Sequence, residues 1–231
     1  MHMYKEIPGL HFFPEFLSAS DCQAMLDGAL CIHKRLKNAV SSLTQRVDIP
    51  QPQLVQNDKD GLNQQKTFSR YTLPDHPKSI QCEVFSNYGG EGHQLVYCRG
   101  NENLPCFIEI QLPKVIEQLQ ALNLVTENLS SPSWRFTMNF YHHHKGQVAG
   151  FPFHVDIPAN GVVTMIMNIQ REATFEITNG QCTEAIHLPV GALLLLSGES
   201  RYQWKHRVLP TRSTENKESK IERVSLVLGI K

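Results

Sequence analysis

The second half of the chain is a succession of short apolar segments separated by polar turns, and this spacing limits the folds that it can adopt. Short strands at such intervals are typical of an antiparallel sandwich or barrel. The charged segment TRSTENKESK near the end is interpreted as a solvated loop. We therefore predict a jelly-roll core over residues 133–231 with eight strands: WRFTMNFYHH, FPFHVD, VVTMIMNIQ, ATFEIT, EAIHLP, GALLLLSG, YQWKHRVLP and IERVSLVLGI.

The first half, residues 1–132, predicts an N-terminal extension and a lid that belong to the same domain as the core. IPGLHFF indicates a short strand, and a helix is expected from about Ser20, capped by a serine hydroxyl. EVFSNYGGEGHQLVYCRG predicts a hairpin, and LPKVIEQLQALNLV predicts a helix that starts near Pro113. From Lys37 to Lys78 the composition is polar and predicts a long loop. The expected architecture is one α+β domain.

The charge of the chain is balanced, with Lys and Arg equal to Asp and Glu at 22 each. A protein that holds nucleic acid by its phosphates usually has a basic excess, so the balance disfavours duplex DNA. The six cysteines include no C-x-x-C pair, and the start MHMYKEIPGL lacks the apolar stretch of a signal peptide. No apolar run approaches the roughly 20 residues that span a bilayer. We predict an intracellular, cytoplasmic protein without a membrane segment.

His154 and Asp156 form an H-x-D pair at the end of a predicted strand. Residues two apart on a strand face the same side, so both side chains can reach one ion. With His206, on a later strand, they provide two imidazoles and one carboxylate, which describe a non-haem Fe(II) centre with three open positions. Mn(II) or Zn(II) can occupy the same ligands. The consecutive histidines 142–144 point in different directions, so we expect no second metal site there.

Arg223 is the candidate anchor for a co-substrate. A 2-oxoglutarate oxidase must hold the distal carboxylate of its keto acid, and the planar fork of an arginine binds a carboxylate at two points. Arg223 lies on the last predicted strand, in an apolar alternation where an unpaired charge would be costly. The alternative is an arginine on an edge strand whose head reaches solvent.

These features resemble, in their order, those of the AlkB-type Fe(II)/2-oxoglutarate-dependent dioxygenases. The resemblance covers nearly the whole chain and implies a double-stranded β-helix core with N-terminal helices. It also implies an enzyme that uses Fe(II), 2-oxoglutarate and O2 to oxidise a C–H bond. The matching pieces are PGLHFFPEFLS followed by a helix, YGG…YCRG…LP, MNFY, the H-x-D pair, GALLLLSGESRYQWKH and RVSLVLG.

The same resemblance implies how the co-substrate is held. Asn139 and Tyr141 would hydrogen-bond 2-oxoglutarate, and Arg223 would pair with its distal carboxylate. From the residues alone, an amide on the apolar strand WRFTMNFY needs a buried partner or a ligand, and a satisfied core group is the alternative. Tyr141 shares the face of Asn139 by the period of two, and a packing role is equally open.

The substrate side departs from the family pattern R-x-N-x-T-x-x-R. Ser225 stands where the family has the asparagine that aids 2-oxoglutarate binding, and Gly229 stands where it has the closing arginine of the substrate side. The resemblance places Tyr97 in the substrate pocket, within a lid region that also contains Arg70 and Tyr88. Aromatic rings there could stack a flipped base or pack the lid on the barrel.

Three functions follow as hypotheses. The first is an AlkB-type oxidative demethylase of N-alkylated bases in single-stranded DNA or RNA. The second is a hydroxylase of proteins or small molecules on the same core, favoured by the neutral charge and the missing closing arginine. A prolyl-hydroxylase-like site would place its cation nearer His206, where Asn216 and Lys217 lie in a polar loop, so it ranks lower. The third is a jelly-roll binding module without activity, which the intact H-x-D…H…R set disfavours.

Overall fold

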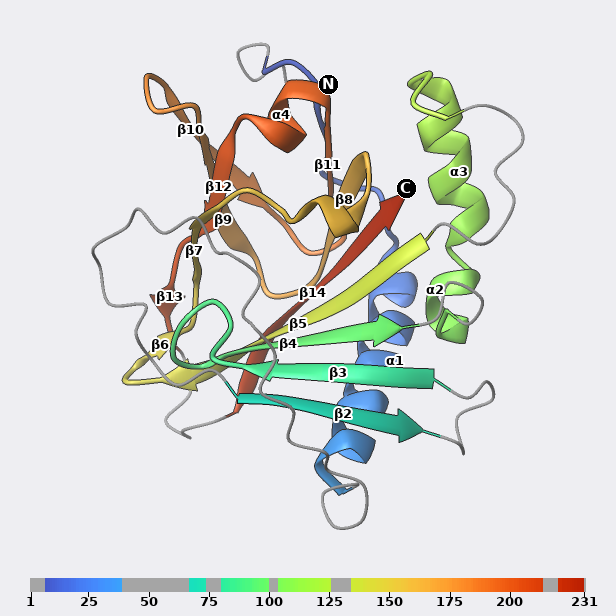
Figure 1. Ribbon diagram of the computed structural model, residues 1–231, viewed down its shortest axis with the longest axis vertical. Coiled ribbons are helices and arrows are strands. Elements are labelled where there is room, and N and C mark those ends of the chain that lie inside the picture. Colours follow the sequence, from blue (N-terminus) through green and yellow to red (C-terminus); the bar gives the residue numbers. More distant parts are fainter. Residues whose placement is uncertain are drawn as a thin grey trace.

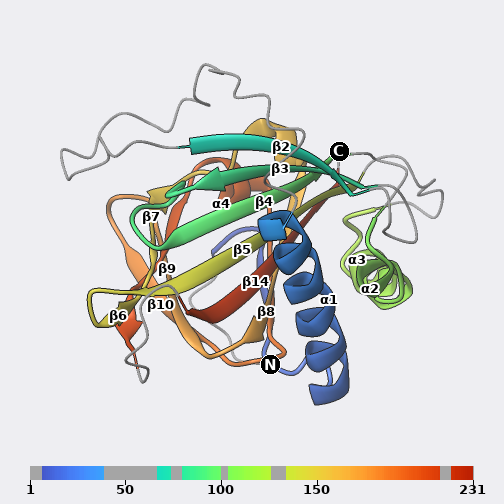
Figure 2. The same cartoon turned by 90° about the horizontal axis from the view of Figure 1, so that it is seen from below.

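Two antiparallel sheets that face each other make up most of the protein, and helices cover the outer face of the larger sheet (Figures 1 and 2). The structure is a computed structural model that describes residues 7–38, 67–73, 80–99, 104–125, 134–213 and 220–230. The two facing sheets are what the predicted jelly roll requires.

The major sheet takes strands from both halves of the sequence. Two short strands, β6 (Gln147–Val148) and β13 (Thr211–Arg212), extend it beside β5. Because the first half contributes four strands, it builds the same sheet as the predicted core rather than only flanking it. The order across the sheet is β1 (Leu10–Phe13), β11 (Leu193–Ser197), β8 (Val163–Gln170), β14 (Ile221–Ile230), β5 (Trp134–His144), β4 (His93–Arg99), β3 (Ile80–Ser86) and β2 (Thr67–Leu73).

The minor sheet contains four strands, all from the second half. The eight strands predicted for this half are all present, and the chain divides them equally between the two sheets. This exchange of strands between two facing layers is the expected jelly-roll pattern. The order of the minor sheet is β10 (Thr183–Leu188), β9 (Ala173–Thr178), β12 (Lys205–Val208) and β7 (Phe151–His154).

The predicted helices are present, with small shifts at their ends. α1 (Ala19–Asn38) is capped by Ser18, whose Oγ accepts the Asp21 N–H at 3.1 Å, while the Asp21 carboxylate accepts the Ser18 N–H at 3.1 Å. The serine cap is therefore confirmed two residues before Ser20. α2 (Cys106–Glu109) and α3 (Leu112–Ala121) follow β4, and α4 (Gly198–Tyr202) and the 3-10 helix η3 (Pro158–Asn160) are further short elements. None of the described helices is long and apolar enough to cross a membrane.

The two faces of the major sheet have different characters. On β5, Phe136, Met138 and Phe140 belong to the apolar cluster that also contains buried residues of α1 and α3. The intervening residues Asn139 and Tyr141 face the minor sheet and line a cavity. The strand period of two thus separates a core face from a face that carries polar groups.

One prediction for the first half was wrong in part. The long loop expected between Lys37 and Lys78 contains a strand, β2, that pairs with β3 from Thr67 to Leu73. β2 is an edge strand with a polar sequence, TFSRYTL, so the apolar alternation that indicates a buried strand is weak there. Residues 39–66 and 74–79 lie outside the described part of the chain.

The buried histidine of α1 predicts a loss of stability at acid pH. The His33 ring lies 4.7 Å from that of Phe140 and 5.9 Å from that of His142. Burial, together with the positive charges of Lys37 and His142, lowers the pKa of His33 to about 4. Between that value and the ordinary pKa of about 6.5, the unfolded chain binds a proton that the folded chain does not. The contribution of neutral His33 to the free energy of unfolding is therefore complete above about pH 6.5 and is lost as the pH falls through 4.

We expect the free energy of unfolding to fall between pH 7 and pH 4, with His33 contributing on the order of 2–3 kcal/mol. Urea unfolding at several pH values measures this loss. His33→Phe should flatten the curve by that amount, because phenylalanine packs at the same place without a titrating group. An unchanged slope in His33→Phe would show that His33 does not carry the effect.

Candidate metal centre

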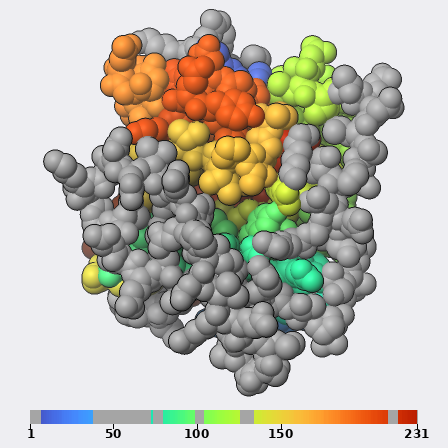
Figure 3. Space-filling model, in the orientation of Figure 1, coloured from blue at the N-terminus to red at the C-terminus, as the bar shows by residue number. Residues whose placement is uncertain are grey.

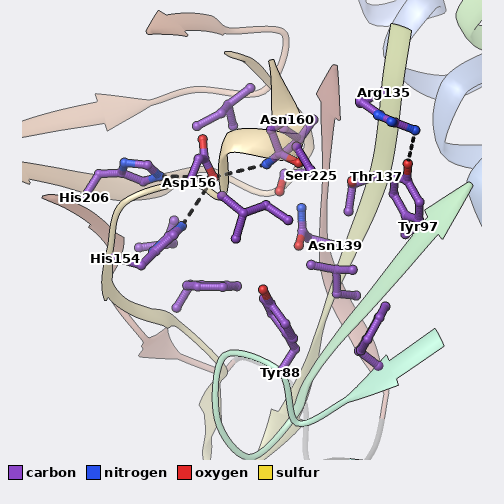
Figure 4. Close-up of a pocket in the computed structure, with 18 of the residues that line it drawn as sticks. Tyr88, Tyr97, Arg135, Thr137, Asn139, His154, Asp156, Asn160, His206 and Ser225 are labelled. Carbon is purple, nitrogen blue, oxygen red and sulfur yellow. Dashed lines mark hydrogen bonds and ion pairs between the residues drawn. The ribbon is translucent and has the colours of Figure 1, made fainter. Parts of the chain in front are cut away.

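Three side chains converge between the two sheets at one end of the minor sheet. His154 ends β7, Asp156 follows in the next turn, and His206 lies on β12 with its Cα opposite that of His154. One ligand atom from each lies within 4.8 Å of the others. The Nε2 atoms of His154 and His206 are 3.7 and 3.9 Å from Asp156 Oδ1 (Figure 4). The structure therefore brings together the three residues that the sequence predicts as ligands.

The two imidazoles are held in place by their surroundings. His154 Nδ1 lies 2.9 Å from the carbonyl oxygen of Pro152, and because a carbonyl can only accept, Nδ1 carries the proton. The Nε2 lone pair of His154 is then available on the side of Asp156. The Phe175 ring stacks on His206 with the centroids 5.2 Å apart. Burial and the positive charge of His154 lower the pKa of His206 to about 3, against the opposing effect of Asp156.

The carboxylate of Asp156 suits a cation. Burial favours its neutral form, but the neighbouring imidazoles of His154 and His206 and the guanidinium of Arg201 outweigh burial and hold the pKa of Asp156 well below its usual range. Its Oδ2 atom is buried without a hydrogen-bond partner among the described residues. A buried oxygen with no donor is costly unless a ligand satisfies it. Two neutral imidazoles and one carboxylate fit a divalent metal such as Fe(II).

A buried arginine on α4 fixes the backbone that follows β7. Arg201 is only 1% exposed, and its Nη1 and Nη2 atoms donate to the carbonyl oxygens of Asp156 and Ile157 at 2.9 and 2.7 Å. These bonds join α4, which precedes the strand of His206, to the turn that carries Asp156. These hydrogen bonds hold the backbone at Asp156 and do not involve its carboxylate.

A cavity of about 670 Å³ lies between the sheets and includes the three candidate ligands. Asn139, Tyr141 and Ser225, which the resemblance assigns to 2-oxoglutarate, line it from β5 and β14. Asn139 and Ser225 are directly opposite each other in the pairing of these strands. The inner face of the major sheet thus presents polar side chains across the cavity from the metal-binding candidates (Figure 4).

Arg223 is buried at the centre of the major sheet, beside this cavity. β14 lies between β8 and β5, and Arg223 is 2% exposed, so the edge-strand alternative is wrong. Its Cζ lies 4.3 Å from the centroid of the Tyr141 ring, and its Nε donates to Asn168 Oδ1 at 3.1 Å. Its Nη1 and Nη2 atoms have no hydrogen-bond partner among the described residues. Two adjacent buried donors of this kind fit a carboxylate.

The two tyrosines expected on the substrate side lie in the cavity, Tyr88 near the metal-binding candidates and Tyr97 farther away beside Arg135 (Figure 4). Tyr88 and Tyr97 both line it, and Arg135 Nη1 donates to the Tyr97 hydroxyl at 2.6 Å. Burial and the negative charge of Asp156 raise the pKa of Tyr88, so its phenol stays protonated. The backbone of Arg70 is opposite Glu83 in the pairing of β2 with β3, but its side chain lies outside the described part of the structure.

Gly229 explains why the closing arginine of the family pattern is absent. A Cβ at this position would lie 1.9 Å from the carbonyl oxygen of Asn160, so no side chain fits. The residue directly opposite Gly229 on β5 is Arg135, which lines the cavity. The Arg135 guanidinium on β5 therefore lies in the same row of the sheet as Gly229 on β14.

The run of histidines 142–144 does not join the metal cluster. His143 accepts a hydrogen bond from the Gly146 N–H at 3.1 Å, and His144 lies 2.5 Å from a Glu91 carboxylate oxygen. The only group with metal-ligand geometry in the described ranges is that of His154, Asp156 and His206. These histidines have different partners, as expected for side chains that point in different directions.

Sequence reasoning missed three polar residues of the site, namely Asn168, Arg201 and His93. Asn168 orients Arg223, Arg201 holds the backbone after β7, and the Nε2 of His93 is 3.2 Å from Asn139 Oδ1. Asn168 could have been found, because it interrupts the apolar strand VVTMIMNIQ as Asn139 interrupts WRFTMNFY. Arg201 lies on the short helix α4 and His93 at the start of β4, in both cases beside other polar residues, so the sequence contains no comparable signal for them.

Comparisons with known proteins bear on the fold. No protein-family model and no curated protein sequence matches the chain. A Pseudomonas putida prolyl-4-hydroxylase resembles it with a TM-score of 0.52 at 12% identity, over 97% of this chain and 94% of that one. For OsALKBH1 the TM-score is 0.49 at 13% identity, over 99% and 100% of the two chains. For the viral collagen prolyl hydroxylase of Paramecium Bursaria Chlorella virus-1 it is 0.47 at 10% identity, over 97% and 96%.

At 12% identity the likeness to the first structure concerns the fold alone. Together with the two facing antiparallel sheets, it confirms the expected α+β fold with a double-stranded β-helix core. The roles of the individual site residues therefore depend on the geometry described above.

The hydrogen bonds of Arg201 predict a loss of metal affinity when they are removed. We expect Arg201→Met to weaken Mn(II) binding by about 10- to 100-fold, the usual effect of removing a partner behind a metal site. Calorimetric titration of the metal-free protein with Mn(II) measures the change. Arg201→Lys keeps the charge but cannot span both carbonyls, so its affinity should be intermediate. Equal affinity in Arg201→Met and the unmodified protein would contradict this role.

Proposed function

We propose that the protein is an Fe(II)- and 2-oxoglutarate-dependent dioxygenase that oxidises a C–H bond of its substrate. The observation that carries this proposal is a pair of unsatisfied groups, one lining the cavity and the other beside Tyr141, which lines it. A His–Asp–His set holds a buried carboxylate oxygen without a donor, and Arg223 holds two buried donors without an acceptor. A divalent cation satisfies the first group and the carboxylate of a keto acid satisfies the second.

Each residue of the site has a role in this proposal. His154, Asp156 and His206 hold Fe(II), and Arg223 binds the distal carboxylate of 2-oxoglutarate at two points. Asn139 donates its amide N–H to the co-substrate, with the Tyr141 hydroxyl and Ser225 beside it. Bound Fe(II) with the keto acid supplies the activation of O2, coupled to decarboxylation to succinate and CO2.

The apolar walls of the cavity are the protein's other contribution. Phe175 and Ile166 line it between the sheets and belong to the buried cluster of the interior. They exclude water from the metal and strengthen the charge interactions there. The gold patch at the centre of the face in Figure 3 belongs to the segment that contains η3, between the orange atoms of α4 and the green strands.

For the substrate, we propose oxidative demethylation of N-alkylated bases in single-stranded DNA or RNA, as in AlkB-type enzymes. Arg223 on the last strand of the core and the order of the motifs support this class. Tyr88, Tyr97 and Phe85 provide aromatic rings on the substrate side of the cavity. Hydroxylation of an N-methyl group yields a hemiaminal that collapses to formaldehyde and the free base, so demethylation and hydroxylation share one step.

A hydroxylase of proteins or small molecules is the second candidate. Gly229 excludes the closing arginine of the family pattern, the formal charge of the chain is zero, and the similar structure at 12% identity is a prolyl-4-hydroxylase. In this case the same metal and co-substrate residues act, and only the group presented to the metal differs.

Succinate formation tests the reaction and the substrate class together. The purified protein is incubated with Fe(II), ascorbate and 2-oxoglutarate, with methylated single-stranded DNA, with methylated RNA or with no substrate. We expect succinate and formaldehyde to rise with a methylated oligonucleotide. Succinate without such a rise would support the hydroxylase, and no succinate under any condition would contradict the dioxygenase.

Removing a metal ligand should abolish the reaction. We expect His154→Ala and Asp156→Ala to form no succinate above background, because each leaves only two ligands. His187→Ala is the matched control, since His187 lies on β10 of the same sheet with its side chain 62% exposed, outside the cavity. Full turnover by Asp156→Ala would exclude this metal site.

Arg135 should act on the substrate and leave the co-substrate unaffected. We expect Arg135→Met to lower kcat/KM for the substrate by about tenfold, the effect of losing one hydrogen bond from a charged donor. The affinity for 2-oxoglutarate should not change. Arg207→Met, which removes a guanidinium paired with Glu176 away from the cavity, is the control. A wild-type kcat/KM in Arg135→Met would show that this end of the cavity does not bind substrate.

A further inference from the structure

A buried histidine stands directly behind the amide that faces the co-substrate. His93 begins β4 and is 1% exposed. Its Cα is opposite that of Tyr141, so it lies beside the row of the sheet that contains Arg223. His93 is not part of the metal-ligand cluster formed among the described residues, and it is not among the residues that line the cavity. Its role must therefore pass through a neighbour.

The hydrogen bonds of His93 determine which of its nitrogens carries the proton. The Gly89 N–H lies 3.0 Å from His93 Nδ1, and because a backbone N–H can only donate, Nδ1 is the acceptor. In a neutral imidazole the other nitrogen, Nε2, then carries the hydrogen. Nε2 is 3.2 Å from Asn139 Oδ1 and donates to it.

This donation also determines the orientation of Asn139. An amide has one accepting oxygen and one donating NH₂ group, and the two are exchanged by rotation of the side chain. With its oxygen bound to His93, Asn139 must direct its NH₂ group away from His93. Asn139 lines the cavity, so this group is available to a ligand there. A carboxylate is such a ligand, because it can only accept.

The surroundings keep His93 neutral and in place. Burial lowers the pKa of His93 to about 3, and the positive charge of Arg223 adds to the effect against the hydrogen bond to Asn139. The ring lies 4.9 Å from that of Tyr141 and 4.7 Å from that of Phe151. Gly89 can approach Nδ1 because it lacks a side chain, since a Cβ there would lie 2.7 Å from the Phe151 ring.

We propose that His93 is a positioning residue that holds the Asn139 amide with its NH₂ group toward 2-oxoglutarate. The relay runs from the Gly89 N–H to His93 Nδ1, and from His93 Nε2–H to Asn139 Oδ1. This inference rests on the proposed function, because it assigns how the chain prepares the donor for the carboxylate of the co-substrate.

The affinity for 2-oxoglutarate is the direct readout. The keto acid is titrated calorimetrically into Mn(II)-loaded protein without O2, so that no turnover occurs. His93→Phe keeps an aromatic ring but removes the donor, whereas His93→Gln places an amide N–H near the position of Nε2. We expect His93→Phe to bind 2-oxoglutarate about tenfold more weakly and His93→Gln to bind within about threefold of the unmodified protein. If His93 acted only by packing, His93→Phe would bind 2-oxoglutarate more tightly than His93→Gln.

A double-mutant cycle tests whether His93 acts through Asn139. Asn139→Ala alone should weaken binding about tenfold, and adding His93→Phe to it should change nothing further. His33→Phe is the control, because it replaces a buried histidine of α1 that packs against Phe140 on the opposite face of the same sheet. Thermal unfolding verifies that each variant folds. If His93→Phe does not fold, His93→Met against His93→Gln makes the same comparison.

The outcomes separate this inference from the proposed function. Wild-type affinity in His93→Phe, or losses that multiply in the double variant, would overturn the role of His93 while leaving the dioxygenase intact. Failure of the unmodified Mn(II)-loaded protein to bind 2-oxoglutarate would overturn both. Weak binding by His93→Phe, rescue by His93→Gln and no further loss on Asn139→Ala together support the relay.

Discussion

A guanidinium buried between two sheets is the constraint on which the arrangement of the site depends. Arg223 lies on the central strand of the major sheet, where removing a charge from water costs several kcal/mol unless partners compensate. Asn168 accepts from its Nε, and the face of the Tyr141 ring lies beside its Cζ. These contacts leave two donors for a carboxylate. The chain thus keeps a costly charge at a place where an anionic co-substrate can satisfy it.

The fold brings the remaining groups to this charge by strand pairing rather than by proximity in the sequence. β7 and β12 are neighbours, so His154 and His206 become opposite residues. Strand pairing does not determine the orientation of the side chains and loops of the site, and buried hydrogen bonds fix two of them. Arg201 holds the turn of Asp156, and His93 holds the amide of Asn139. Asp156 and Asn139 are thus each supported by a second polar residue behind them, which prepares these two positions before any ligand binds.

The sequence predicted the parts of this arrangement that have a local pattern. Alternation of apolar residues indicated the eight strands, and the H-x-D pair with a later histidine indicated the ligands. β2 was missed because its edge position requires no apolar alternation. Arg201 and His93 were missed because their partners, Asp156 and Asn139, are distant in the sequence and become neighbours only in the folded sheet pair. The pairing of Gly229 with Arg135 was equally invisible, since a register between strands has no signature in either strand alone.

The proposed function requires that the metal and the keto acid bind side by side through these residues. A crystal structure of the protein grown without O2, with Mn(II) and 2-oxoglutarate, would show whether they do. We expect one Mn(II) bonded to His154, Asp156 and His206, chelated by the keto acid, with the distal carboxylate on both terminal nitrogens of Arg223. Mn(II) bound by other residues, or 2-oxoglutarate bound away from Arg223, would contradict the proposed site.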